Sequence, residues 1–320
     1  MLGSNSKAAL AAVLLAAVPA FMGIASWGLA RGIEPFVTWY YCFAWWSYIA
    51  LVEAWLHRRG GNSELWRRPK AWFELLPVSI GVWLIFELYN FRLHNWHYLN
   101  LPDSTPVRWL GYSLAFATVL PGLFASRRLI DHLGWFTAAD CPPLVCSDRI
   151  LMTLQVLGGL FLAAPLIWPQ VAFPWIWLGF ILLLEPLNYR MKVPSLLQDL
   201  ANGAPGRLYQ LLAAGLWCGL LWEFWNYWAG SKWVYTLPLF NRPRLFEMPL
   251  AGFLGFPPFA LECFAMVSTI QALRDRARTR LSRPTRRRLA LVIWVLVLLA
   301  FLGAFSGIDR FTVRSYHSVF

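Results

Sequence analysis

The chain contains a series of apolar segments that approach the length of a membrane-spanning helix. The clearest of them, LALVIWVLVLLAFLGAF at 289–305, has no charged residue. A helix needs about 20 residues to cross a hydrocarbon core of roughly 30 Å. A transmembrane β-barrel would instead show short segments of alternating polarity, and this run does not alternate. The predicted fold class is therefore all-α, a polytopic membrane helical bundle.

Hydropathy predicts about nine transmembrane helices, and the composition agrees. Only 14% of the residues are charged, whereas a soluble domain carries about 25%, so the chain has too few to cover a water-facing surface. The predicted spans lie near Ala8–Ala30, Phe36–Leu56, Ala71–Phe91, Trp109–Ala125, Leu151–Trp168, Trp175–Leu187, Leu208–Ala229, Met248–Ala272 and Leu289–Gly307.

The basic residues predict how the chain is oriented. With the N-terminus inside, 20 of the 28 Lys and Arg fall in cytoplasmic segments, eight of them arginines between Arg274 and Arg288. This positive-inside bias predicts a multi-pass protein of a bacterial-type inner (cytoplasmic) membrane, with its N-terminus cytoplasmic and its C-terminus outside. Membrane lipids with anionic headgroups are the expected partner of this basic segment, and nucleic acid is not.

Histidine and cysteine patterns do not indicate a metal centre. Cys141 and Cys146 form a C-x4-C pair in a loop, with no second pair, and His94 and His97 have no evident third ligand. Nucleotide-binding and hydrolase motifs are also missing from the sequence. We expect neither a metal nor a cofactor.

The second half of the chain repeats the first. FELYNFRLHNWHYLNLP at 86–102 matches WEFWNYWAGSKWVYTLP at 222–238, and LVEAWLHRRGGNSEL at 51–65 matches LLEPLNYRMKVPSLL at 183–197. Each copy would hold four spans, so the copies share one orientation and form a tandem parallel repeat about an axis along the membrane normal.

The repeat divides the chain into four predicted parts. These are the first four-span repeat at 1–130, the second at 131–273, a basic cytoplasmic loop at 274–288, and an extra C-terminal span with its tail at 289–320.

Glutamates inside the predicted spans are the main candidates for a functional site. A carboxylate at the bilayer centre costs about 2.5–3.5 kcal/mol, so we expect these side chains to face a sheltered interior. Glu87 and Asn90 share one helix face, as do Glu223 and Asn226, and Glu262 is expected to approach Glu223. These five are the candidate catalytic residues. The alternative is that they are polar contacts that fix helix packing.

Aromatic residues follow both Glu-Asn pairs and are the candidate substrate-binding residues. They would line a cavity for an apolar isoprenoid or lipid ligand, or stabilise a carbocation by cation–π attraction. An aromatic belt at the membrane interface is the alternative. The set comprises Trp96 and Tyr98 in the first copy, and Trp222, Trp225, Tyr227, Trp233 and Tyr235 in the second.

The order of these motifs resembles a known family. WEFWNYW at 222–228, WVY at 233–235 and FEMPLAGFLGFPPFALE at 246–262 are similar to the tandem three-helix lycopene cyclase domain of bacteria and fungi, and 86–124 is a weaker copy. The resemblance covers about a third of the chain. It implies a non-redox cyclase that protonates an alkene of a carotenoid, with Glu223 and Glu87 as the acid ahead of each aromatic loop.

Three functions stay open on the sequence. The first is a membrane enzyme that acts on an isoprenoid or lipid by acid-initiated chemistry, of the cyclase, hydratase or isomerase type. The second is a transporter with parallel repeats. The third is a non-catalytic lipid-binding or assembly protein. The substrate and the oligomeric state stay undetermined.

Overall fold

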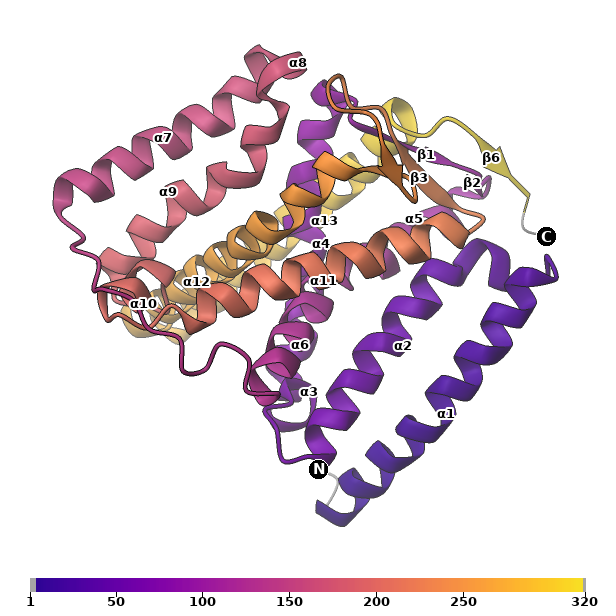
Figure 1. Cartoon of the computed structure of the whole chain (residues 1–320), viewed down its shortest axis with the longest axis horizontal. Coiled ribbons are helices and arrows are strands. Elements are labelled where there is room, and N and C mark those ends of the chain that lie inside the picture. The colour runs from indigo at the N-terminus through magenta and orange to yellow at the C-terminus, as the bar shows by residue number, and fades with distance from the viewer. Residues whose placement is uncertain (1–3, 319–320) are drawn as a thin grey trace.

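The computed structural model describes residues 4–318 and is a bundle of long helices (Figure 1). Seven helical segments of this described part are long and apolar enough to cross a membrane, which confirms the predicted class of an all-α membrane bundle. They are Ser6–Ala30, Pro69–Leu93, Thr105–His132, Asp148–Ile167, Pro169–Met191, Leu250–Arg280 and Arg283–Phe311.

The helices follow one another along the chain, with the longer connections after α4, α6 and α11. They are α1 (Ser4–Ala30), α2 (Phe36–Arg58), α3 (Glu64–Arg67), α4 (Pro69–Leu93), α5 (Thr105–Phe116), α6 (Val119–His132), α7 (Asp148–Ile167), α8 (Pro169–Ala172), the 3₁₀ helix η1 (Phe173–Trp175), α9 (Ile176–Met191), α10 (Leu196–Ala201), α11 (Gly206–Trp228), the 3₁₀ helix η2 (Leu250–Gly255), α12 (Phe256–Arg280) and α13 (Arg283–Phe311).

Two hairpins flank a central group of helices. The α1–α2 hairpin and the α7–α9 hairpin lie on opposite sides of the molecule, and α4, α6, α11 and α12 lie between them (Figure 1). Helix α2 packs on α6, α9 packs on α12, and the C-terminal α13 packs on α4. The buried aromatic core lies between these central helices.

A glycine allows the two helices of the second hairpin to approach closely. A Cβ added at Gly158 of α7 would lie 2.5 Å from the backbone nitrogen of Leu183 and 2.8 Å from its Cα, in α9. Gly159, the next residue, has nothing within 4 Å of such a Cβ. Gly158 is therefore required by the packing of α7 on α9, whereas Gly159 is not.

The fourth predicted span is broken into two helices. Pro121 lacks the N–H that would bond the carbonyl of Ala117, so α5 ends at Phe116 and α6 begins at Val119. Ser79 of α4 bonds the backbone at this break, because its hydroxyl donates to the Phe116 carbonyl (2.6 Å) and accepts from the Leu120 N–H (3.0 Å).

The segment 274–288, predicted as a basic loop, is helical over most of its length. Helix α12 continues to Arg280 and α13 begins at Arg283, so only two residues connect them. Arginine is a good helix former, and the Ser282 hydroxyl caps α13 by accepting from the Thr285 N–H. The arginines therefore extend two helices beyond their apolar segments.

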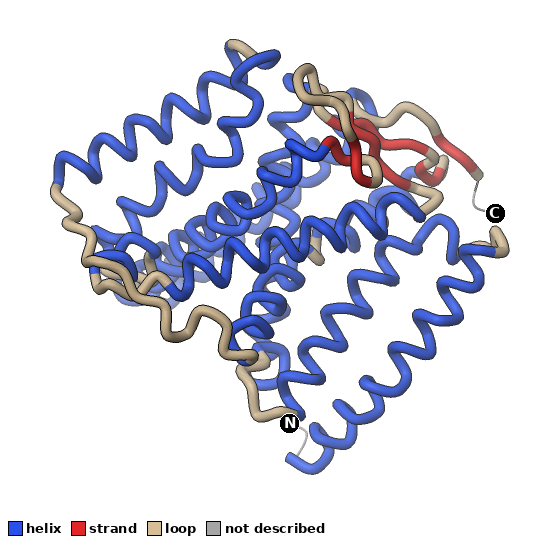
Figure 2. Tube along the Cα trace, viewed as in Figure 1, coloured by secondary structure: helices blue, strands red, loops and turns tan. Residues whose placement is uncertain are grey.

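Short strands form at the end of the bundle where α4 and α11 finish (Figure 2). Strands β1 (Trp96–Leu99) and β3 (Lys232–Tyr235) pair antiparallel, and we call this pair the ribbon. The sequence predicted loops here. The remaining strands are β2 (Leu101–Pro102), which pairs with β6 (Tyr316–His317), and β4 (Arg244–Leu245), which pairs with β5 (Met248–Pro249).

Candidate functional site

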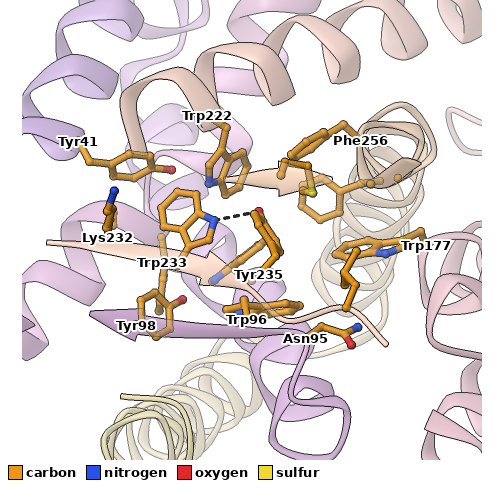
Figure 3. A pocket seen from close by; sticks show the side chains of 18 of the residues that line it. Tyr41, Asn95, Trp96, Tyr98, Trp177, Trp222, Lys232, Trp233, Tyr235 and Phe256 are labelled. Carbon is orange, nitrogen blue, oxygen red and sulfur yellow. Dashed lines mark hydrogen bonds between the residues drawn. The ribbon is translucent and has the colours of Figure 1, made fainter. Parts of the chain in front are cut away.

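The ribbon brings the two W-x-Y motifs together. Trp96 lies opposite Tyr235, and Tyr98 lies opposite Trp233. Side chains alternate along a strand, and directly opposed residues share a face of the sheet. All four aromatic side chains therefore project from one face of the ribbon, towards the helices (Figure 3).

Beneath this face lies a cavity of about 460 Å³, within the size range of small-molecule sites. Its wall is predominantly aromatic and apolar, and both halves of the chain contribute to it (Figure 3). Besides the four ribbon residues, the rings that line it include Trp39, Tyr41, Trp83, Tyr112, Phe116, Phe173, Trp177, Trp222, Phe256 and Phe259.

Glu87 lies behind this wall, fully buried in α4. Its Oε1 accepts hydrogen bonds from the indole N–H groups of Trp83 and Trp96, each at 3.0 Å, and from the hydroxyl of Tyr98. Its Oε2 is buried without a partner in the described chain. The carboxyl thus holds three of the side chains that form the cavity wall.

Glu223 occupies the corresponding place in α11 and is also fully buried. Its Oε1 accepts a 2.7 Å hydrogen bond from the hydroxyl of Tyr235, and that hydroxyl accepts one from the indole of Trp233 at 2.8 Å. Oε2 of Glu223 again has no partner within residues 4–318.

The tyrosine hydroxyls are the groups that connect the carboxyls to the cavity. Burial raises the pKa of both Tyr98 and Tyr235 well above its ordinary value, and the neighbouring glutamate adds to each shift. Both phenols therefore stay protonated at neutral pH.

The predicted catalytic asparagines hold the ribbon and do not line the cavity. The Asn90 carboxamide accepts from the backbone N–H groups of Asn95 (2.8 Å) and Trp96 (3.2 Å) and donates to the carbonyl of Trp96 (2.9 Å). Asn226 bonds the N–H (3.0 Å) and carbonyl (2.9 Å) of Trp233 in the same way. Asn90 and Asn226 therefore act as clamps: each fixes one ribbon strand to the end of the helix before it.

Glu262 is buried in α12 and binds a different helix from the one expected. Its Oε1 accepts a 2.8 Å hydrogen bond from the backbone N–H of Phe180 in α9, and it is not a cavity-lining residue. The expectation that it would approach Glu223 rested on span positions alone, which do not fix how a helix is rotated. Glu262 joins α12 to α9.

Two of the predicted substrate-binding residues lie outside the cavity. Trp225 packs against the ring of Trp45 at a centroid distance of 5.0 Å, and Tyr227 is 41% exposed on the far side of α11. The other five, Trp96, Tyr98, Trp222, Trp233 and Tyr235, line it.

Sequence reasoning missed several wall residues. Trp83 lies four residues before Glu87, so the two share one helix face. That spacing could have identified Trp83 from the sequence. Trp177, Tyr41 and Asn95 reach the cavity only through the packing of other elements and had no comparable signal.

Comparison with known proteins finds no matching family model, curated protein or solved structure. No group of three or more His, Cys, Asp or Glu side chains within residues 4–318 is placed to hold a metal ion. The fold and the site together define a helical membrane protein with an aromatic cavity beneath a two-stranded ribbon.

Proposed function

We propose that this protein is a membrane enzyme that acts on an isoprenoid or similar lipid by acid-initiated chemistry in the cavity beneath the ribbon. One observation carries the proposal. Two tyrosine hydroxyls line an apolar cavity, and each is hydrogen-bonded to a buried glutamate behind the wall: Tyr98 to Glu87 and Tyr235 to Glu223.

The wall suits a hydrocarbon that passes through a cation. Aromatic faces attract a positive charge by roughly 0.5–2 kcal/mol per ring. Trp83, Trp222 and Trp177 come from three different elements and line the same space, so rings would surround the reacting carbon on several sides. The apolar surroundings also exclude the water that would trap a cation.

In the proposed step the glutamic acid starts protonated, and a tyrosine gives its own proton to an alkene carbon and takes the carboxyl proton in its place. The 2.7 Å contact between Tyr235 and Glu223 then carries a proton from carboxyl to phenol. The cation is attacked by a second alkene, a C–C bond forms, and a neighbouring carbon returns a proton to the pair. The product is an isomer of the substrate, and no electrons are exchanged.

The finer architecture is also part of the proposal. We infer nine spans, with α2 and α11 crossing beside the other seven segments, and two parallel four-span copies related by a pseudo-two-fold axis. The antiparallel ribbon supports the axis, because each W-x-Y faces the other. The matching Asn90 and Asn226 clamps support it too.

Contacts at two further levels support the same repeat. Trp45 packs on Trp222 of the other half at 6.0 Å, and its counterpart Trp177 stacks on Phe86 at 5.1 Å. At the opposite end of the bundle, Ser63 and Ser195 each donate to a buried glutamate ten residues earlier, Glu53 and Glu185.

By the distribution of basic residues, the ribbon end faces outside and the N-terminus lies in the cytoplasm of a bacterial-type inner membrane. The likeness to the lycopene cyclase domain supports the reaction class, since those proteins protonate an alkene without redox chemistry.

The proposal is tested by turnover in proteoliposomes. Purified protein is incubated with lycopene, squalene and geranylgeraniol, and products are separated by chromatography and mass spectrometry. We expect a product of unchanged mass, and a loss of about 10²-fold or more in the Tyr235→Phe, Tyr98→Phe double variant. Tyr227→Phe, outside the cavity, is the control. A double variant with the turnover of the wild type would contradict the proposal.

One observation favours a second candidate, a non-catalytic lipid-binding protein. Neither Glu87 nor Glu223 lines the cavity itself, so a bound lipid does not meet either carboxyl directly. This candidate predicts that the same ligands bind and are recovered unchanged from the wild-type protein.

A further inference from the structure

Asn95, which precedes the ribbon strand β1, lines the cavity although it is polar (Figure 3). It is only 2% exposed. Its backbone is bonded on both sides, because its N–H donates to the Asn90 carboxamide and its carbonyl accepts from Thr236. The side-chain Oδ1, in contrast, is buried without a hydrogen-bond partner in the described part of the chain.

A buried amide without a partner is costly, and most such groups in proteins are bonded to protein or to a bound molecule. The rings of Trp96 and Trp177 lie beside it in the wall, and the indole N–H of Trp96 does not serve Oδ1 because it already donates to Glu87. Because this carboxamide lines the cavity, a bound molecule can supply the partner that the wall does not.

The second copy differs from the first at this position. When Trp96 is matched with Trp233, Asn95 matches Lys232. Lys232 also lines the cavity, but its ammonium is already bonded to Glu247 at 2.8 Å and to the carbonyl of Tyr227 at 3.2 Å. Because the strands are antiparallel, Asn95 and Lys232 lie at opposite ends of the ribbon. One end of the cavity thus has a satisfied ion pair and the other an unsatisfied neutral amide.

We propose that the cavity binds an isoprenoid or lipid alcohol, with its single uncharged hydroxyl hydrogen-bonded to Asn95 and its apolar body against the aromatic wall. This inference rests on the proposed function of the cavity and narrows its ligand class. A hydroxyl suits the site because it both donates and accepts, so it pairs with either atom of the carboxamide. A phosphate or carboxylate does not, since both cations that line the cavity are already paired, Lys232 with Glu247 and Arg108 with Asp309.

The experiment compares three ligands that share one hydrocarbon chain and differ in the head group: geranylgeraniol, the same hydrocarbon without the hydroxyl, and geranylgeranyl phosphate. Binding to the protein in nanodiscs of zwitterionic lipid is followed by quenching of tryptophan fluorescence. We expect the wild type to prefer the alcohol about tenfold over both of the others. Asn95→Leu should lose that preference while retaining affinity for the hydrocarbon. Asn202→Leu, at an exposed position just after α10, should keep it.

The outcomes separate this inference from the proposed function. Equal binding of alcohol and hydrocarbon by the wild type would overturn the hydroxyl assignment and leave the cavity as a lipid site. Tighter binding of the phosphate would overturn the uncharged class. No binding of any of the three would overturn the cavity function and this inference together. The wild-type comparison stands by itself if Asn95→Leu does not fold.

Discussion

The hydroxyl of Tyr235 donates a 2.7 Å hydrogen bond to Oε1 of Glu223, so the wall of the cavity is connected to a carboxyl that the cavity does not contain. Tyr98 and Glu87 repeat the relationship in the other half of the chain. A side chain on a ribbon strand thereby donates a hydrogen bond to a buried acid on a helix of the bundle. The same contact serves structure and, in our proposal, proton transfer.

Tyr235→Phe should destabilise the fold by about 1–3 kcal/mol, because it removes the hydroxyl that donates to buried Glu223. Thermal unfolding of the purified protein in detergent measures the change. The matched control is Tyr227→Phe, whose side chain is 41% exposed, and we expect an effect near zero. Equal effects of the two substitutions would contradict the structural role of the Tyr235 hydroxyl.

Asn90→Ala should loosen the ribbon more than Asn226→Ala. Asn90 makes three hydrogen bonds to the backbone of 95–96, and Asn226 makes two to Trp233. Each bond contributes about 1 kcal/mol. Amide hydrogen exchange over 95–99 and 232–235 reports the loss. Protection of both strands at the wild-type level in Asn90→Ala would show that the clamp is not needed.

Asp309→Ala should detach α13 from the bundle. This carboxylate accepts from the guanidinium of Arg108 (2.7 Å), the indole of Trp109 (2.9 Å) and the hydroxyl of Tyr112 (2.8 Å), and Arg108 is 6% exposed. Removing the carboxylate leaves the buried Arg108 without its partner, and such a loss costs up to roughly 3–5 kcal/mol when both partners are buried; Asp309 is 17% exposed, so we expect the lower part of that range.

The comparison for Asp309 is Asp275, which is 68% exposed and pairs with Arg278, 61% exposed, so its ion pair should contribute almost nothing. Limited proteolysis near the C-terminus and thermal unfolding measure both variants. Similar stability of Asp309→Ala and Asp275→Ala would contradict the anchoring role.

Gly158→Ala and Gly159→Ala should change the stability of the fold in opposite directions, although the two residues are neighbours. The new methyl of Gly158→Ala meets the backbone of Leu183, which cannot move cheaply, so we expect a loss of about 1–3 kcal/mol. At Gly159 the space is open and alanine has the better helix propensity, so we expect a gain of up to about 1 kcal/mol. The midpoint of thermal unfolding measures both variants. A shift of the midpoint in the same direction for both would contradict the prediction.

The sequence was sufficient for the class of fold because helix length and hydropathy are local properties. It also identified Glu87, Glu223 and the aromatic motifs through their repetition. It could not show that W-x-Y pairs with W-x-Y, since strand pairing between residues more than a hundred positions apart depends on how two helix ends meet. The partner of Glu262, which is Phe180 of another helix, was hidden for a similar reason. Asn90 and Asn226 bind backbone five to seven residues further on, and that contact depends on how the chain turns at the end of each helix.

Helix rotation accounts for the remaining differences. In α11 the inward positions are Trp222, Glu223 and Asn226, and Tyr227 therefore points outward. The motif WEFWNYW has aromatic residues on every side, so its hydropathy contains no signal for which face is buried. Trp225 packs on Trp45 of α2, a contact that only the assembled bundle defines.

The most direct test of the central claim is where a ligand binds. A geranylgeraniol analogue with a diazirine on its chain is photolysed with the protein in nanodiscs, and the labelled peptides are mapped by mass spectrometry. We predict labelling of the two ribbon strands, 96–99 and 232–235, that excess geranylgeraniol suppresses. Labelling confined to the outer surfaces of α1 and α13, unaffected by competitor, would contradict the claim that the aromatic cavity is the functional site.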